Sequence, residues 1–141
     1  YWNQNARGVL SGLTRDTGPK EIVRSTIESV AYQTHDLFEA MKHDGLRPKI
    51  IKVDGGMVMN NWFAQFLSDV VNVKVLRPKV HETTALGAAF MAGLQIGAYK
   101  SLKDISRNWS LDKRFSPKMK KKSRNNLLNG WTKAIKRALI N

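Results

Sequence analysis

The residues IIKVDGGMVMNN, Ile50 to Asn61, join a β-branched apolar run to two adjacent glycines and then to two asparagines. The apolar run predicts a strand over residues 49–54, buried on both faces. Because glycine has no Cβ, Gly55 and Gly56 can adopt positive φ and let another group approach the backbone closely. Asn60 or Asn61 can cap a following helix, whose expected inward face is Trp62, Phe63, Phe66, Leu67 and Val70.

Upstream of this stretch, we expect one strand and one long helix. Residues 8–13 (GVLSGL) are typical of a short strand bounded by turn residues. Pro19 is a favourable first helical residue, with Gly18 as the N-cap. Apolar residues then recur at helical spacing until Gly45, where the helix should stop.

Downstream, the alternation of strands and helices continues. A strand is expected over residues 73–76, closed by Arg77-Pro78, and a buried, closely packed helix should begin at Thr83 or Thr84. The order of elements implies an α/β fold with a parallel sheet of three strands and covering helices. The exposed edge of so small a sheet indicates further strands encoded upstream.

The positive charge is concentrated in the last third of the chain. The net charge is +13, and residues 99–141 carry 13 Lys and Arg against 2 Asp and Glu. We expect a polar connector with one helical turn over residues 100–123. A basic amphipathic helix should follow, with the apolar face Leu127, Leu128, Trp131, Ile135, Ala138 and Leu139. The run KMKKKSR has no interleaved aromatic residues, which favours a solvated connector over a nucleic-acid-binding patch.

Composition excludes several other classes of protein. No apolar run approaches the roughly 18 residues that a membrane span requires, so no integral membrane segment is expected. The chain has no cysteine, which excludes disulfides and thiolate metal sites. A cytoplasmic location is the default expectation. The chain opens with Tyr1-Trp2 inside what reads as folded-domain sequence, which indicates a fragment whose N-terminal portion is missing.

The sequence contains few motifs that carry chemistry. It has neither a G-x-x-x-x-G-K-[ST] phosphate loop nor a G-x-G-x-x-G fingerprint. The three histidines have no metal-ligand spacing, and His81-Glu82 is explained by a helix start. We therefore assign no catalytic and no metal-binding residue. The glycine pair remains as a candidate ligand-binding site, because it follows a predicted strand and ligands of open α/β sheets lie at the carboxyl ends of strands. Either a flat ligand rests on Gly55-Gly56 beside an asparagine amide, or the loop is a tight capped turn with nothing bound.

Six sequence blocks, in order and register, resemble the FGGY family of carbohydrate kinases, and most closely its glycerol-phosphorylating members. The blocks are YWNQNARGVLSGLTR, its continuation to GPKEIVRSTIE, ESVAYQT, VDGGMVMNNWFAQFLSD, RPKVHETTALGAAFMAGLQIG and NGWTKAIKRA. The resemblance runs from Tyr1 to about Leu139. It implies the C-terminal domain of the family, with a ribonuclease-H-like (actin-like ATPase) fold that is incomplete on its N-terminal side. Residues 1–98 would be the core on the nucleotide side, and residues 99–141 a basic connector and amphipathic helix of the same domain.

The resemblance also implies a function and a site. Family members of this kind transfer the γ-phosphoryl group of ATP, with Mg²⁺, to glycerol, giving glycerol 3-phosphate. Matched position by position, Gly56 and Asn60 are nucleotide contacts, and Gly55 joins them on the backbone-approach argument. Asp54 matches the family loop but receives no catalytic role. The general base and the glycerol contacts would precede Tyr1, so this chain alone should be inactive.

Three alternative functions stay open at this point. A sister FGGY kinase acting on xylulose or gluconate would share these blocks. A basic nucleic-acid-binding module would show salt-sensitive retention of DNA or RNA. A non-catalytic remnant would bind only a nucleotide or a partner subunit. The sequence does not decide whether the protein forms a homo-oligomer.

Overall fold

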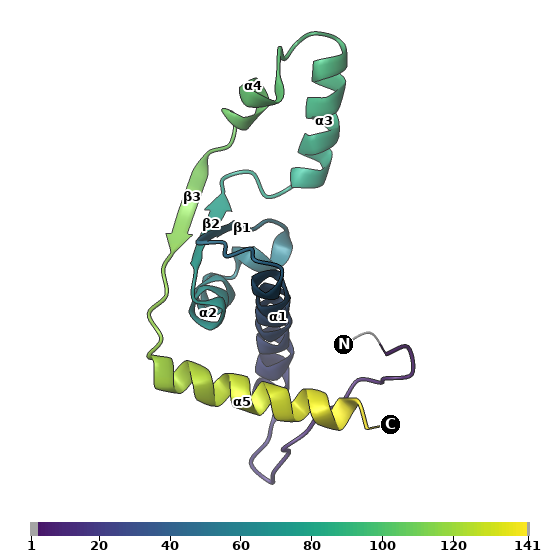
Figure 1. Cartoon of the computed structure of the whole chain (residues 1–141), viewed down its shortest axis with the longest axis vertical. Helices are drawn as coiled ribbons and strands as arrows, with labels where there is room; N and C mark the ends of the chain where they lie inside the picture. The colour runs from purple at the N-terminus through teal and green to yellow at the C-terminus, as the bar shows by residue number, and fades with distance from the viewer. Residues whose placement is uncertain (1–2, 141) are drawn as a thin grey trace. The chain divides into compact units, whose positions relative to one another are not determined.

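The computed structural model describes residues 3–140 (Figure 1). These residues form two compact units. The helical unit comprises residues 3–47, 69–71 and 118–140, and the sheet unit comprises residues 48–68 and 72–117. Tyr1 and Trp2, with which the family resemblance begins, lie outside the described residues. The predicted boundary between residues 98 and 99 stays a prediction. No helix in residues 3–140 combines the length and the apolar character that crossing a membrane requires.

The long helix of the helical unit, α1 (Pro19–His43), confirms the predicted start and stop. Gly18 is the N-cap, and its N–H donates to the Glu21 carboxylate at 2.9 Å. This hydrogen bond lowers the pKa of Glu21. After the C-cap Asp44, the chain turns at Gly45, whose φ of 85° is the left-handed conformation that favours glycine. Local sequence signals therefore define both ends of α1.

The second helix of this unit, α5 (Lys121–Ala138), is the predicted basic amphipathic helix, and its predicted apolar face is half-buried throughout. Trp131 on α5 stacks on Tyr32 of α1, with ring centroids 5.5 Å apart.

The expected strand over residues 8–13 is wrong, because that segment contains no strand and Leu10 is 57% exposed. A strand needs a hydrogen-bonded neighbour, and among the described residues strand pairing joins only β1, β2 and β3.

Three strands make one sheet in the described part of the sheet unit, in the order β1-β2-β3. They are β1 (Ile50–Lys52), β2 (Lys74–Pro78) and β3 (Leu111–Phe115). β1 and β2 are parallel, with Ile51 opposite Val75, as predicted. β3, in contrast, is antiparallel to β2, and Phe115 lies opposite Val75. The α/β class is therefore confirmed, whereas the expectation of a wholly parallel sheet is wrong.

Three details of the predicted strands also need correction. The segment 100–123, expected to be a connector, contains β3 after the predicted short helix α4 (Leu102–Ser106). β2 continues through Arg77-Pro78 instead of ending before them, and the β2–β3 register shifts between these two residues, where a proline without an N–H is tolerated. β1 is not buried on both faces, since Ile50 is 50% exposed on a strand at the edge of the described sheet.

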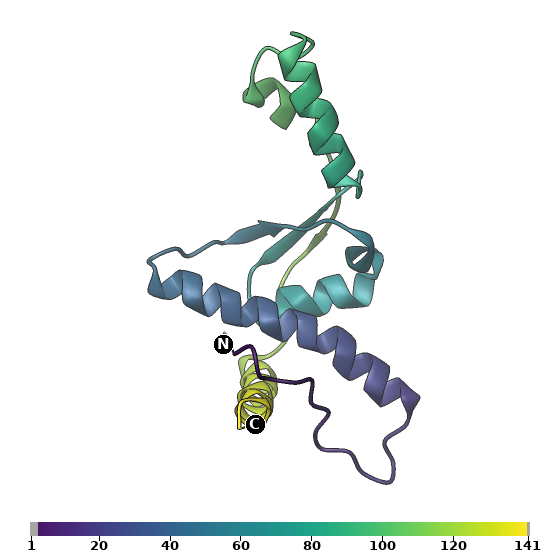
Figure 2. The ribbon, with the colours of Figure 1, turned by 90° about the vertical axis from the view of Figure 1, so that its right-hand side faces the viewer.

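Helix α2 (Asn61–Val71) lies along one face of the sheet (Figure 2). The residues that it buries include four of the five predicted ones, namely Phe63, Phe66, Leu67 and Val70. The fifth, Trp62, is 40% exposed and stacks on Phe66, with 5.1 Å between ring centroids. Two side chains of α2 reach the end of β3: Gln65 donates to Ser116 O, and the Ser68 hydroxyl lies 3.2 Å from Phe115 O.

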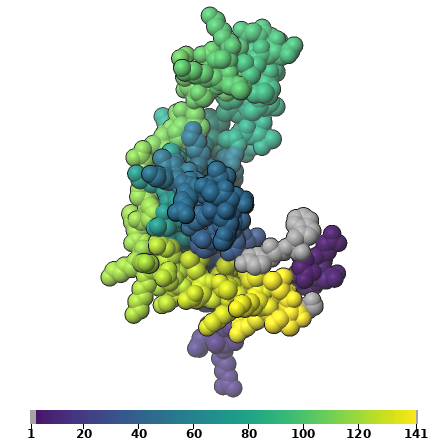
Figure 3. All heavy atoms as spheres, in the orientation of Figure 1, coloured from purple at the N-terminus to yellow at the C-terminus, as the bar shows by residue number. Residues whose placement is uncertain are grey.

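Helix α3 (Thr83–Gln95) begins where predicted but is mostly exposed. Among the described residues its buried position is Gly93, while Met91 is 53% exposed. A Cβ at Gly93 would lie 2.7 Å from the Tyr99 ring, so close packing against Tyr99 requires glycine there. Figure 3 shows the atoms of residues 83–106, in green, gathered at one end of the view. The expectation of a buried helix is wrong because apolar composition favours burial, but burial occurs only where another element packs against the helix.

Candidate functional site

The glycine pair follows the carboxyl end of β1 and forms a two-part turn. Val53 N still donates to Leu76 O at 3.1 Å, so the backbone runs beside β2 for one residue beyond the strand. Gly55 then has φ 86° and ψ 172°, a combination that side chains strongly disfavour. A 3₁₀ helix, η1 (Gly56–Met59), follows and leads to Asn60, the N-cap of α2. The expected positive φ is confirmed at Gly55.

The structure explains why residue 55 is a glycine, but it gives no such reason for residue 56. A Cβ built on either would have no described heavy atom within 4 Å, so the backbone faces open space. At Gly55 the positive φ alone explains the residue. Gly56 has neither a positive φ nor a close neighbour among the described residues. Neither the backbone conformation nor the packing of the described residues therefore requires glycine at position 56. The absence of a side chain there would let a bound ligand approach the backbone.

The side-chain carbonyl oxygen of Asn60 accepts hydrogen bonds from the first turn of α2. Its Oδ1 accepts hydrogen bonds from the backbone N–H groups of Trp62 and Phe63, at 2.9 and 3.2 Å. These bonds satisfy two of the four N–H groups that every helix start leaves without an intrahelical acceptor. The carbonyl oxygen of the amide is thus committed to α2. The chemistry that Asn60 can offer a ligand is hydrogen-bond donation from Nδ2.

The loop is held by two anchors that sequence reasoning missed. Gly55 N donates to the backbone carbonyl of His81 at 3.2 Å. Arg77 Nη1 donates to the carbonyls of Val58 and Met59, at 2.9 and 3.2 Å. The sequence alone predicts for Arg77 only a place at the close of a strand. The available signal was a cation placed directly after the apolar run VKVL, where a buried charge requires partners.

The remaining candidates lie elsewhere or contribute no assigned chemistry. Asp54 is exposed at the start of the loop. His35 and His43 lie on α1 in the helical unit, whereas His81 belongs to the sheet unit, with an Nδ1 that is buried and has no hydrogen-bond partner. Residues 3–140 contain no group of three His, Cys, Asp or Glu residues that could hold a metal ion.

The groups with clearly perturbed pKa values belong to the helical unit rather than to the loop. Burial, together with a hydrogen bond to Glu28, raises the pKa of Tyr32 well above its ordinary value. Burial also lowers the pKa of His35. A hollow in the same unit is lined by residues 8–11, α1 and α5, including Tyr32 and Trp131. None of these groups forms part of the glycine loop, which lies in the sheet unit.

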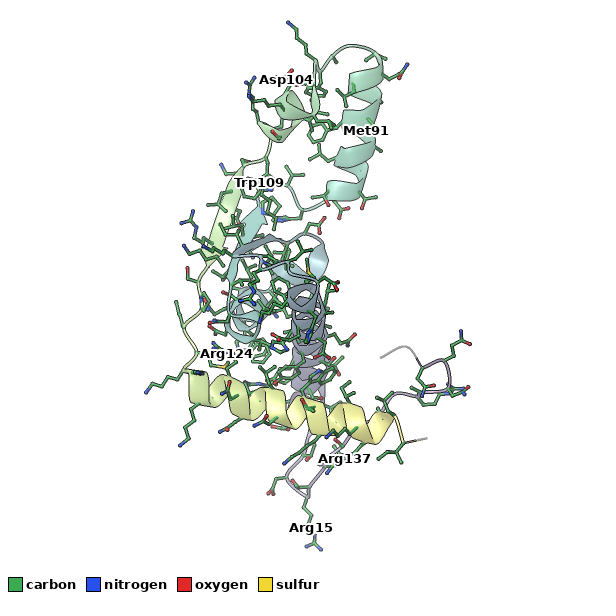
Figure 4. All side chains as sticks on the ribbon, in the orientation of Figure 1. Arg15, Met91, Asp104, Trp109, Arg124 and Arg137 are labelled. Atoms are coloured by element: carbon green, nitrogen blue, oxygen red, sulfur yellow. The ribbon has the colours of Figure 1, made fainter. Side chains whose placement is uncertain are left out.

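Basic side chains are distributed along the C-terminal part of the chain. Figure 4 labels Arg124 and Arg137, which lie toward opposite ends of α5. In the sheet unit, the Lys52 ammonium lies 4.1 Å from the centroid of the Trp109 ring, a cation–π contact.

Comparison with known proteins identifies the relatives of this chain. Residues 1–96 match the model of the FGGY family of carbohydrate kinases, C-terminal domain. The chain is 54% identical over 137 residues to a glycerol kinase of Pseudomonas aeruginosa, covering 97% of this chain and 28% of that protein. It is 49% identical over 140 residues to a glycerol kinase of Caldanaerobacter subterraneus, covering 99% of this chain and again 28% of the relative.

Solved structures agree with these relatives. A crystal structure of Plasmodium falciparum glycerol kinase with ADP is similar, with a TM-score of 0.83 and 36% identity, over 99% of this chain and 28% of that one. A ligand-bound xylulose kinase from Lactobacillus acidophilus is also similar, with a TM-score of 0.76 and 27% identity, over 98% and 28% of the two chains. The chain thus spans 28% of the length of the proteins that it resembles.

Proposed function

The chain belongs to the FGGY family of carbohydrate kinases, and we propose that it supplies the adenine-nucleotide side of the cleft in an ATP-dependent glycerol kinase. The predicted fold class, a ribonuclease-H-like (actin-like) C-terminal FGGY domain, is confirmed by the family match and the similar structures. The proposed activity is transfer of the γ-phosphoryl group of ATP to glycerol, giving glycerol 3-phosphate. We propose this activity for a complete protein of the relatives' length and not for this chain alone, which covers 28% of that length.

The open backbone at Gly55 and Gly56 carries this proposal. A purine ring is flat, and it can lie closest to the main chain where no side chain projects. The loop follows the carboxyl end of β1, where α/β sheets bind their ligands. Asn60 Nδ2 would donate to the nucleotide while Oδ1 caps α2. The similar Plasmodium falciparum enzyme, whose structure contains ADP, supports a nucleotide as the ligand.

The other expected components would come from outside the described residues. Mg²⁺ would accompany ATP, held by phosphate oxygens, water and side chains of the rest of the protein. Glycerol and the general base would likewise be bound and supplied there. Phosphoryl transfer depends on positioning and on charge stabilisation at the reacting oxygens, so we expect this chain alone to transfer no phosphoryl group. The cytoplasm stays the expected location.

Gly56→Val in the complete protein tests the proposed site. The fold should tolerate valine, because the backbone has no positive φ there and no described atom lies within 4 Å of the added Cβ. A nucleotide on the loop would collide with the side chain, so the KM for ATP should rise by about tenfold or more, which corresponds to about 1.4 kcal/mol. The KM for glycerol should change little.

Gly130→Val is the matched control, since Gly130 on α5 also has no positive φ and no described neighbour within 4 Å. It should leave the KM for ATP unchanged. A folded Gly56→Val protein with the wild-type KM for ATP would contradict the proposed site.

The choice of glycerol over a sugar acceptor rests on identity. The glycerol kinase of Pseudomonas aeruginosa is 54% identical to this chain, whereas the xylulose kinase of Lactobacillus acidophilus is 27% identical. Phosphorylation assays of the complete protein with glycerol, xylulose and gluconate would test this choice. Faster turnover of either sugar substrate would assign the protein to a sister branch.

A further inference from the structure

Arg77 is a buried cation in the sheet unit, with 6% of its surface exposed. Taking a charge out of water costs several kcal/mol unless hydrogen bonds and counter-charges compensate for the lost hydration. The buried guanidinium therefore needs hydrogen-bond acceptors or a carboxylate close to it. Those partners come from two directions, one along the sheet and one from the glycine loop.

Within the sheet, Arg77 Nε donates to Asp112 Oδ2 at 2.7 Å, joining β2 to its antiparallel neighbour β3. The guanidinium also lies 5.5 Å from the Phe115 ring centroid. The planar group is thus fixed in orientation by a carboxylate and an aromatic ring. Only the Arg side chain offers several N–H donors in one rigid plane, so a lysine could not reproduce this arrangement.

Toward the loop, Arg77 Nη1 donates to the carbonyls of Val58 and Met59. These two residues end η1, which begins at Gly56. The end of a helical turn leaves carbonyl groups without an intrahelical partner, and the guanidinium satisfies two of them here. Val58 is itself buried, which holds the end of η1 against the sheet.

We propose that Arg77 is a positioning residue for nucleotide binding, which it supports by holding η1 and the adjoining Gly55, Gly56 and Asn60 in place. It acts through the carbonyls of Val58 and Met59 and makes no contact with the nucleotide. The hydrogen bond from Gly55 N to His81 O holds the other end of the loop. This inference rests on the proposed function of the loop.

The test uses the complete protein and compares Arg77→Met, Arg77→Lys and Asp112→Asn. Arg77→Met removes all three hydrogen bonds and should raise the KM for ATP by about tenfold, since small misplacements of a binding loop cost large factors. The KM for glycerol should stay within about twofold of wild type. Arg77→Lys should recover part of the loss. Asp112→Asn, which keeps an acceptor oxygen for Nε, should have the smallest effect.

Arg107→Met is the matched control. Arg107 is exposed and pairs with Asp104 at 3.0 Å, so its loss also removes an arginine ion pair from the sheet unit. It should leave both KM values unchanged. Amide hydrogen exchange gives a second readout: in Arg77→Lys, residues 55–60 should exchange faster relative to α4 than they do in the wild type. Should Arg77→Met fail to fold, Arg77→Lys decides the matter by the same two readouts: a wild-type KM for ATP and wild-type exchange of residues 55–60 in Arg77→Lys would overturn the inference.

Two results separate this inference from the proposed function. If Gly56→Val raises the KM for ATP while the Arg77 variants lower only the melting temperature, Arg77 is merely structural and the inference is overturned. If Gly56→Val leaves ATP binding intact, the proposed nucleotide site itself fails, and the positioning role fails with it.

Discussion

The indole Nε1 of Trp131 on α5 donates a hydrogen bond to Asp36 Oδ2 on α1, at a distance of 2.7 Å. The same indole stacks on Tyr32, one turn of α1 away from Asp36. The two contacts use the two properties of tryptophan, a large apolar ring and a single polar N–H. The hydrogen bond connects residues that are 95 positions apart in the sequence.

Trp131→Phe should lower the stability of the helical unit by about 1.5 kcal/mol, because phenylalanine can still stack but cannot donate. That figure is at the lower end for hydrogen bonds to charged groups, since Asp36 is partly exposed. Thermal unfolding of the complete protein measures the loss. Asp36→Asn keeps an acceptor oxygen and should cost less. A Trp131→Phe protein as stable as wild type would show that the hydrogen bond contributes nothing.

Asn60→Ser and Asn60→Ala should separate the two functions of the amide. Serine retains an oxygen that can cap α2 but lacks the Nδ2 donor, whereas alanine lacks both. Both variants should raise the KM for ATP by about 2-fold to 10-fold, the effect of one hydrogen bond. Only Asn60→Ala should also lose about 0.5–2 kcal/mol of stability. A wild-type KM for ATP in Asn60→Ser would remove Nδ2 from the nucleotide site.

Ser68→Ala should destabilise the sheet unit by about 1–3 kcal/mol, because it deprives buried carbonyls of a donor. Ser68 is fully buried, and its hydroxyl lies 2.8 Å from Val73 O and 3.2 Å from Phe115 O. Urea unfolding of the complete protein measures the change. Ser106→Ala is the control, since Ser106 is exposed on α4 and its loss should stay within about 0.5 kcal/mol. Equal effects of the two substitutions would contradict this prediction.

His35 should make stability depend on pH on the acidic side of neutrality. Burial lowers the pKa of His35, against the opposing influence of Glu39 and Asp36. The unfolded chain therefore takes up this proton more readily than the folded one, and stability should be lost as the pH falls below about 6.5, the ordinary histidine value. Melting temperatures measured between pH 7.5 and pH 5.5 should fall less in His35→Gln than in wild type.

His43→Gln, which removes an exposed histidine from the same helix, is the control for the loss of an imidazole. If His35→Gln retains the full wild-type fall in melting temperature, the acid sensitivity comes from other groups.

Sequence reasoning succeeded where the cause of a structure is local. Gly18 and Pro19 predict the start of α1, and Gly45 its stop, because caps and left-handed turns depend on adjacent residues. The same reasoning limited the cap of α2 to Asn60 or Asn61, of which Asn60 is the cap, and allowed the positive φ found in the glycine pair. It failed for residues 8–13 and for β3, because strand formation depends on a partner that the local sequence does not specify.

By itself, the sequence determined the family, both ends of α1, the starts of α2 and α3, and the presence of a side-chain-free turn after β1, since each of these depends on short runs of residues. The tertiary structure alone decided what holds that turn in place. Arg77 reaches Val58 and Met59 across 19 and 18 residues, and Asp112 across 35. These partners meet only when β2, β3 and η1 are packed together, and a buried cation selects its acceptors by distance in space rather than along the chain.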